Sequence, residues 1–251
     1  MLVLVLLVQL LGGGSKVIEI EVLKDVTLTE GLSGYTLSFA GQGKEETLLT
    51  IDASGNYFNG TSFKFKDLSV SVGTGFKNSP SLWFEDCNII SNYSKHWGIG
   101  DVTFKNCVFV DGNEGKTNKD NYLYNMEWYS GTNFVFEDCE FISSNGKFIN
   151  AYIEPYAGDE SKIITVTMKN CHFDSGEGPS NNKAALNIKK TGTWIINLTN
   201  VTTDELVATG SATGSRLYNL ESGAYIGTKI TIDGVVVWEN GAKVETSATA
   251  Q

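Results

Sequence analysis

Aromatic side chains gather in three long segments of the sequence, 91–101, 111–132 and 143–162. Asparagines and carboxylates stand among them in each segment. This mixture suits a carbohydrate, because the aliphatic hydrogens of a sugar pack on a ring while its hydroxyls bond to amides and carboxylates. The residues expected to contact a ligand are Trp97, Tyr124, Trp128, Tyr129, Tyr152 and Tyr156. The alternative interpretation is that these rings only cover an apolar flank of the protein.

Groups suited to catalysis are sparse in the same segments. Glu127 and Glu154 form the best available pair for a glycosidase that works with two carboxylates. The chain holds 2 histidines, and neither His96 nor His172 stands in a pattern that suggests a catalytic triad. We therefore favour a non-catalytic protein and keep a polysaccharide-active hydrolase or lyase as the alternative.

Oxygen-bearing side chains crowd one loop of the sequence. They are Asp111, Asn113, Glu114, Asn118, Asp120 and Asn121. Calcium prefers such ligands, but their spacing meets no EF-hand pattern, and Asn, Asp and Gly favour turns without any ion. We therefore expect no metal and no other cofactor, and calcium is an option that no motif supports.

The overall charge narrows the choice of partner. With 19 Lys+Arg against 29 Asp+Glu, the chain has a formal net charge of −10, so nucleic acid or another polyanion would be repelled. A hydrophobic content of 41% with only 3 prolines in 251 residues excludes disorder and leaves room for a sizeable core. A polysaccharide or a host glycan is the expected partner.

An internal repeat organises the chain. Its pattern is apolar, any, apolar, charged, Asp or Asn, small apolar, any, apolar, which alternates with the period of strands on either side of one bend. The clear copies are 63–70, 82–89, 102–109, 134–141 and 166–173; looser copies are 22–28, 196–203 and 230–237. Equivalent core positions are Val26, Leu68, Cys87, Cys107, Cys139, Cys171, Val201 and Val235. The gap of 42 residues between the first two fits two coils.

The bend position is the informative one. It is held by Asp25, Asp67, Asp86, Asn106, Asp138, Asn170, Asn200 and Gly234. These residue types best tolerate a left-handed backbone conformation, which a helical repeat would not need. A short two-strand unit cannot bury its apolar face alone and must stack on its neighbours. The repeat therefore predicts an all-β parallel solenoid of about nine coils, on the order of 43 Å long.

Two further columns agree with in-register stacking. The residue before the bend alternates in sign through Lys66, Glu85, Lys105, Glu137 and Lys169, so neighbouring coils would pair opposite charges. A column of asparagines appears in 124–126, 149–151, 186–188 and 218–220. We assign these asparagines to the remaining strand of each coil, where stacked amides can bond to one another along the axis.

The four cysteines all fall on one repeat position, which is held elsewhere by Leu68, Val201 and Val235. A zinc site would need pairs separated by two to four residues, and these cysteines are at least 19 apart. A buried line of thiols is therefore favoured, because free cysteine is among the most buried residue types. Disulfide bridges between adjacent coils stay open as an alternative, since the coil spacing suits them.

The repeat with its one-residue bend resembles the right-handed parallel β-helix of the pectate-lyase-like superfamily, over roughly residues 18–238. The strings at 23–32 and 34–37 are similar to the first coils of bacterial cell-surface, adhesin-like β-helix proteins. The resemblance implies polysaccharide lyases and hydrolases, whose chemistry fits this chain poorly. Arg216 is the only arginine, and neither an Asp-Asp pair nor a Gly-His-Gly string occurs.

The two ends differ in character from the repeat. Residues 1–17 carry an apolar run of ten followed by Gly-Gly-Gly-Ser, which is too short for a membrane span. They are a leader, a cap on the first coil or an added segment, and 239–251 form a polar tail. We expect a monomeric extracellular or cell-surface β-helix that binds a glycan or host surface without catalysis. The alternatives are a polysaccharide-active enzyme on the same scaffold and a structural spacer of a larger surface protein.

Overall fold

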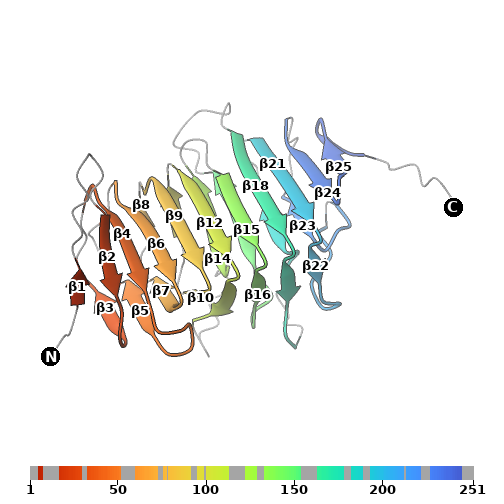
Figure 1. The fold of residues 1–251 in the computed structure, drawn as a ribbon. Helices are drawn as coiled ribbons and strands as arrows, with labels where there is room; N and C mark the ends of the chain where they lie inside the picture. The colour runs from red at the N-terminus through yellow and green to blue at the C-terminus, as the bar shows by residue number, and fades with distance from the viewer. Residues whose placement is uncertain are drawn as a thin grey trace.

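The computed structural model is an elongated stack of short strands (Figure 1). It describes residues 5–7, 17–29, 33–51, 60–72, 76–77, 79–91, 95–98, 100–112, 122–128, 133–153, 163–177, 182–188, 193–211, 213–221 and 227–244. These residues contain strands and turns but no helix, so none of them forms a helix that could cross a membrane. The prediction of an all-β fold is confirmed.

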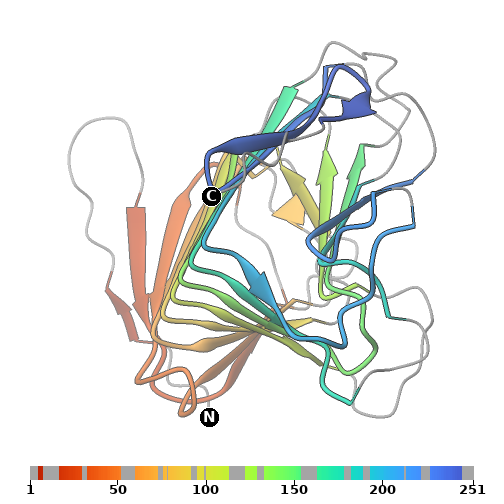
Figure 2. The ribbon, with the colours of Figure 1, turned by 90° about the vertical axis from the view of Figure 1, so that its right-hand side faces the viewer.

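The strands form three sheets, which enclose the core like the sides of a prism (Figure 2). The first, sheet A, has the order β1-β2-β4-β6-β9-β12-β15-β18-β21-β24-β25-β26. Its strands are β1 (Val5–Leu7), β2 (Val17–Glu21), β4 (Thr36–Ala40), β6 (Ser62–Lys66), β9 (Ser81–Glu85), β12 (Asp101–Lys105), β15 (Asn133–Glu137), β18 (Ile163–Lys169), β21 (Thr193–Thr199), β24 (Lys229–Ile232), β25 (Val235–Glu239) and β26 (Ala242–Lys243).

The other two sheets complete each coil. Sheet B runs β22-β19-β16-β13-β10-β7-β5-β3, and sheet C runs β23-β20-β17-β14-β11-β8. Sheet B holds β3 (Val26–Leu28), β5 (Leu48–Ile51), β7 (Ser69–Val72), β10 (Asn88–Ser91), β13 (Val108–Asp111), β16 (Glu140–Ile142), β19 (His172–Asp174) and β22 (Thr202–Thr203). Sheet C holds β8 (Phe76–Lys77), β11 (Lys95–Gly98), β14 (Tyr124–Trp128), β17 (Ile149–Ile153), β20 (Leu186–Ile188) and β23 (Tyr218–Leu220).

Successive coils lie in register with one another. Of the 12 described strands of sheet A, β1, β25 and β26 run antiparallel to their neighbours, and the remaining nine are parallel. Sheets B and C are parallel throughout their described strands. The chain is therefore a parallel β-helix, and the nine parallel strands of sheet A match the predicted number of coils.

The bend between sheets A and B is a single left-handed residue in most coils. Six of the predicted positions have φ between 49° and 55°: Asp67, Asp86, Asn106, Asp138, Asn170 and Asn200. Side-chain amides link neighbouring bends, as where Asn200 Nδ2 donates to Asn170 Oδ1 at 3.0 Å. Asp and Asn suit this position because their short polar side chains tolerate the left-handed region and bond locally.

The first coil departs from the predicted register. Val26 pairs with Leu49, which pairs with Val70, so Val26 lies two positions beyond the Leu68 row. Asp25 has no positive φ and instead accepts a hydrogen bond from Leu48 N at 2.9 Å. The second coil, which the 42-residue gap predicts, carries no clear copy of the repeat because residues 41–47 replace the one-residue bend with a longer turn, in which Gly43 N bonds to Asp67 O.

The last predicted copy is a hairpin and not a coil. Asp233 and Gly234, with φ of 47° and 81°, connect β24 to β25, whose residue Val235 pairs antiparallel with Ile232. Two consecutive positive φ values are the mark of a type I′ turn. Val235 is therefore 48% exposed and not a core residue, which corrects the predicted equivalence. At the opposite end, the apolar N-terminal run contributes β1, which pairs antiparallel with β2.

Phenylalanine rings stack along the interior of sheet A. The row Phe39, Phe65, Phe84, Phe104 and Phe136 has centroid separations between 4.7 and 5.6 Å from one coil to the next. All five side chains are almost completely buried. Because the inward positions are filled in this way, we look for a functional site on the outward faces of the sheets.

Outside the bend, the alternating charges pair as predicted. Lys66 Nζ lies 3.0 Å from Glu85, and Glu137 contacts both Lys105 at 3.5 Å and Lys169 at 3.3 Å. Exposed ion pairs of this kind contribute little to stability, because water and salt screen them. They agree with the strand register, in which Lys66, Glu85, Lys105, Glu137 and Lys169 are successive direct partners.

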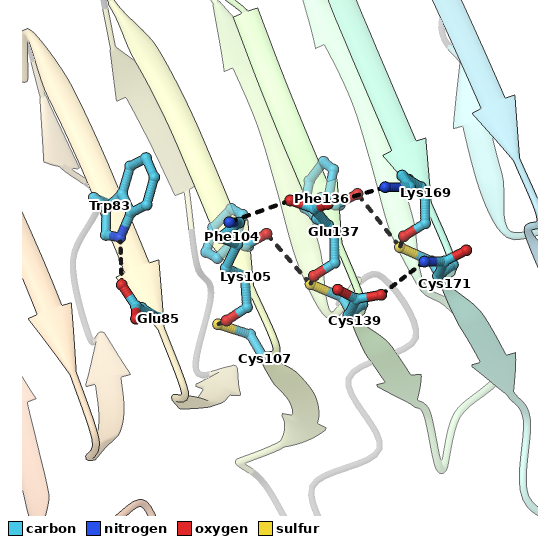
Figure 3. A network of polar contacts seen from close by, with 12 residues as sticks. Trp83, Glu85, Phe104, Lys105, Cys107, Phe136, Glu137, Cys139, Lys169 and Cys171 are labelled. Atoms are coloured by element: carbon cyan, nitrogen blue, oxygen red, sulfur yellow. Dashed lines mark hydrogen bonds and ion pairs between the residues drawn. The ribbon is translucent and has the colours of Figure 1, made fainter.

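The four cysteines form the predicted interior line. All are free and buried, and backbone hydrogen bonds join their positions from coil to coil, as where Val108 N bonds to Cys87 O and Glu140 N to Cys107 O. Figure 3 shows three of the sulfurs in succession beneath sheet A. Each thiol donates to the carbonyl two residues earlier, for example Cys139 Sγ to Glu137 O at 3.3 Å. The cysteines are core residues in this structure.

Candidate functional site

The outward face of sheet C carries a row of asparagines. Asn125, Asn150, Asn187 and Asn219 are direct register partners on β14, β17, β20 and β23. Residues on either side of them, such as Met126 and Ala151, are buried in the core, so the asparagine row belongs to the opposite face. The asparagine column expected from the sequence is confirmed.

Hydrogen bonds divide this row into two pairs. Asn150 Nδ2 donates to Asn125 Oδ1 at 3.1 Å, and Asn219 Nδ2 donates to Asn187 Oδ1 at 3.1 Å. No such bond joins Asn150 to Asn187, because Asn187 Nδ2 donates to Tyr122 Oη at 3.0 Å and to Glu221 Oε1 at 2.7 Å. Asn150 is 8% exposed, and its Oδ1 has no hydrogen-bond partner among the described residues. A buried acceptor without a partner costs roughly 1–3 kcal/mol, which a ligand hydroxyl or amide could recover.

Two residues at the start of the sheet C strands add to this cluster. Tyr122 precedes β14 and Lys147 precedes β17, and they are brought together by the backbone bond from Leu123 N to Lys147 O. Lys147 Nζ lies 5.7 Å from the centre of the Tyr122 ring, within the range of a cation–π contact. Asn187 is on β20, and β17 lies between β20 and β14. The Tyr122 side chain, just before β14, therefore reaches across β17 to contact Asn187. Tyr122 and Lys147 are both buried in this arrangement.

A second row on sheet C contains three of the residues singled out from the sequence. Trp97 pairs with Glu127, and Glu127 pairs with Tyr152, on β11, β14 and β17. This row stands two residues beyond the asparagine row, so both rows occupy the same face of the sheet. The backbone thus brings an aromatic, a carboxylate and a second aromatic position into one line beside the amides. The side chains of these three residues lie outside what the structure describes.

Tyr124 does not belong to this face, which corrects the expectation that it contacts a ligand. It is 4% exposed, and its ring packs edge-on against Phe104 at 5.3 Å and Phe109 at 5.8 Å. Burial raises the pKa of its hydroxyl well above the usual range. Trp128 pairs with Gly98 and Ile153, and its side chain lies outside what the structure describes. Tyr129, Glu154 and Tyr156 lie outside the described residues.

Several members of the site could not be selected from the sequence as ligand-binding residues. Tyr122, Lys147, Asn150, Asn187 and Glu221 meet only because strands from different coils stack side by side in sheet C. The asparagine column predicted from the sequence placed four strands on this face. Nothing in the sequence indicated that Tyr122 and Asn187, 65 residues apart, would share a hydrogen bond.

The chemistry of this face is that of hydrogen bonding. The described part of the chain holds no group of three or more His, Cys, Asp or Glu side chains arranged to hold a metal. From the suspected calcium loop, Asp111 is described, and its carboxylate accepts hydrogen bonds from the backbone and hydroxyl of Ser144. Residues 113–121 of that loop lie outside the described residues. The site therefore gathers amides, a carboxylate and a phenol, of which Asn187 is 1% exposed and Tyr122, Asn125 and Asn150 are each 8% exposed.

The architecture places the chain among the parallel β-helix solenoids, with a polar outward face on sheet C. Comparison with protein-family models, with curated proteins and with solved structures finds no match.

Proposed function

We propose that this protein is a monomeric extracellular or cell-surface β-helix of the pectate-lyase-like, adhesin-like kind that binds a glycan without catalysis. The outward face of sheet C is the binding surface in this proposal. The observation that carries it is the row Asn125–Asn150–Asn187–Asn219 beside the row Trp97–Glu127–Tyr152. Amides and aromatic residues in adjacent rows are the combination that sugars require.

The arrangement of the rows favours an extended chain of sugars over a single one. Both rows run across the strands, along the axis of the β-helix, and repeat about every 4.8 Å. That repeat is close to the length of one pyranose unit in an extended polysaccharide. Each coil can therefore offer an equivalent position to each successive sugar.

The charge on the site favours a neutral glycan. Glu221 accepts from Asn187 on this face, Glu127 lies in the second row, and the chain as a whole has a net charge of −10. A uronate polymer would be repelled by these carboxylates, whereas the hydroxyls and N-acetyl groups of a neutral polymer would donate to them. Chitohexaose and cellohexaose are suitable soluble probes, since both are uncharged and only the first carries amides.

Isothermal titration calorimetry tests the proposal with the wild-type chain and two variants, Trp97→Ala and Tyr152→Ala. We expect each variant to weaken binding of at least one probe by about tenfold, the loss of one aromatic contact. Ile163→Ala is the matched control, because Ile163 is 54% exposed on sheet A, away from this face. Equal affinities for all four proteins would refute the proposal, as would the absence of heat with wild type.

A carbohydrate-active enzyme is the second candidate, and one observation favours it. The amide of Asn187 joins the Tyr122 hydroxyl to the Glu221 carboxylate, which are groups able to carry protons. Release of reducing ends or of unsaturated products from polysaccharides by wild type, and its loss in Tyr122→Phe and Glu221→Gln, would establish this function in place of simple binding.

A further inference from the structure

Trp83 is an exposed aromatic residue on a face remote from sheet C. It lies in β9, at the centre of sheet A, and its side chain points outward with 38% exposure. Among the residues that the structure describes, it is the one aromatic side chain in the group of exposed large hydrophobics. Its neighbours in sequence, Leu82 and Phe84, are buried, so the alternation of the strand fixes its direction.

The indole is held in place by a short chain of polar contacts. Trp83 Nε1 donates to Glu85 Oε2 at 3.4 Å, and Glu85 Oε1 accepts from Lys66 Nζ at 3.0 Å. Figure 3 shows the ring lying alongside β9 with its nitrogen directed at Glu85. A ring that is already oriented loses less side-chain entropy when a ligand packs on it.

Polar side chains surround this ring. Its register partners are Lys64 on β6 and Thr103 on β12, and the exposed residues Ser81 and Asp101 form the adjacent row. Asp101 Oδ1 is oriented by a bond from Asn133 Nδ2 at 2.8 Å. A protein-binding hot spot would be surrounded by further apolar contacts. One aromatic plane among hydroxyls, a carboxylate and an ammonium instead matches a sugar, which has apolar faces and a polar rim.

We propose that Trp83 is the platform of a second carbohydrate site, in which a neutral pyranose ring packs on the indole and its hydroxyls bond to Lys64, Ser81 or Asp101. This site is independent of the one on sheet C, because sheets A and C form different sides of the prism (Figure 2). A chain with two such faces can hold two polysaccharide strands at once, or bind one matrix with increased avidity.

Isothermal titration calorimetry of chitohexaose and cellohexaose with wild type, Trp83→Ala, Trp83→Phe and Ile163→Ala tests this site. The expected results are about a tenfold loss of affinity at one site in Trp83→Ala, a smaller loss in Trp83→Phe, and none in Ile163→Ala. Thermal unfolding of Trp83→Ala should match that of wild type, since the side chain is on the surface.

The stoichiometry separates this site from that on sheet C. Two sites per chain in wild type that fall to one in Trp83→Ala support both proposals. One site that Trp83→Ala weakens supports the sheet A site and counts against the sheet C site. Unchanged affinity and stoichiometry in Trp83→Ala would overturn the sheet A site, and so would a wild-type chain that binds neither oligosaccharide.

Discussion

Asn170 donates a hydrogen bond from Nδ2 to Asp138 Oδ1 at 2.8 Å, linking the bends of two neighbouring coils. Both residues hold the left-handed conformation, with φ of 53° and 54°. The same side chain accepts from Asn200 on the next coil at 3.0 Å. One residue therefore serves two functions, because it turns the chain and also fixes the register of three coils.

Substitution of Asn170 separates these two functions. Asn170→Ala should lower the free energy of unfolding by about 2 kcal/mol, from the left-handed strain on a Cβ and the lost amide bonds. Asn170→Gly loses the same bonds without the strain, so its loss in free energy of unfolding should be smaller than that of Asn170→Ala by about 1 kcal/mol. Urea unfolding of the three proteins measures the difference, and equal losses in the two variants would show that strain plays no part.

Phe104 should be among the most sensitive core positions. Its ring stacks on Phe84 at 4.7 Å and Phe136 at 5.1 Å and is 1% exposed. Phe104→Ala should lower the free energy of unfolding by about 3–5 kcal/mol, and Phe104→Leu, which is the safer variant for folding, by about 1 kcal/mol. The neighbouring outward residue provides the control, Thr103→Ala, expected within about 0.5 kcal/mol of wild type. A similar small loss at both positions would contradict the assigned core.

The four thiols should be unreactive in the folded chain. Their exposure is 2% or less, and burial raises the pKa of the Cys107 thiol, while a hydrogen bond to Cys139 together with burial raises that of Cys171. A thiol-specific chromogenic disulfide reagent at pH 8 should therefore label all four only after unfolding in denaturant. Leu206→Cys, at a position that is 49% exposed, is the reactive control. Rapid labelling of the native wild-type protein would show that the thiols are not buried in the core.

Asp204 should make stability fall at acid pH. Burial alone would raise the pKa of this carboxyl, but hydrogen bonds from the backbone N–H groups of Ser175, Val207 and Leu206 hold it below its usual range. Because the folded pKa is depressed, the stabilisation is present above the unfolded value of about 3.9 and is lost as pH falls below it. Urea midpoints measured between neutral and acid pH should decline less in Asp204→Asn than in wild type. Equal declines of the urea midpoint in the two proteins would show that Asp204 is not responsible for the loss of stability at acid pH.

The fold was predictable because its repeat depends on local residue types. Period-two alternation and one Asp or Asn per bend are visible in every coil from Phe63 to Thr203, and the structure keeps that register. The two ends were misread where a different local structure replaced the bend. The pairs Asp233–Gly234 and Asn240–Gly241 are typical type I′ turn sequences, so the terminal hairpins could have been found from the chain itself.

The candidate site was predictable only in part, because its contacts join distant segments. The asparagine row follows from the repeat, but Tyr122 reaches Asn187 only when the intervening strand β17 is stacked in place. Tyr124 was misassigned because an aromatic residue beside Asn125 has the same appearance in sequence whether it faces inward or outward. Trp83 was overlooked for the opposite reason, since it occupies an outward position within a regular copy of the repeat.

The most direct test of glycan binding on sheet C is hydrogen–deuterium exchange of wild type with and without saturating chitohexaose. We expect slower exchange in the peptides that cover β11, β14 and β17, which carry both rows. The terminal hairpin β25–β26 provides an internal reference that should not change. Exchange that slows only outside sheet C, or nowhere in the chain, would contradict the assignment of this face.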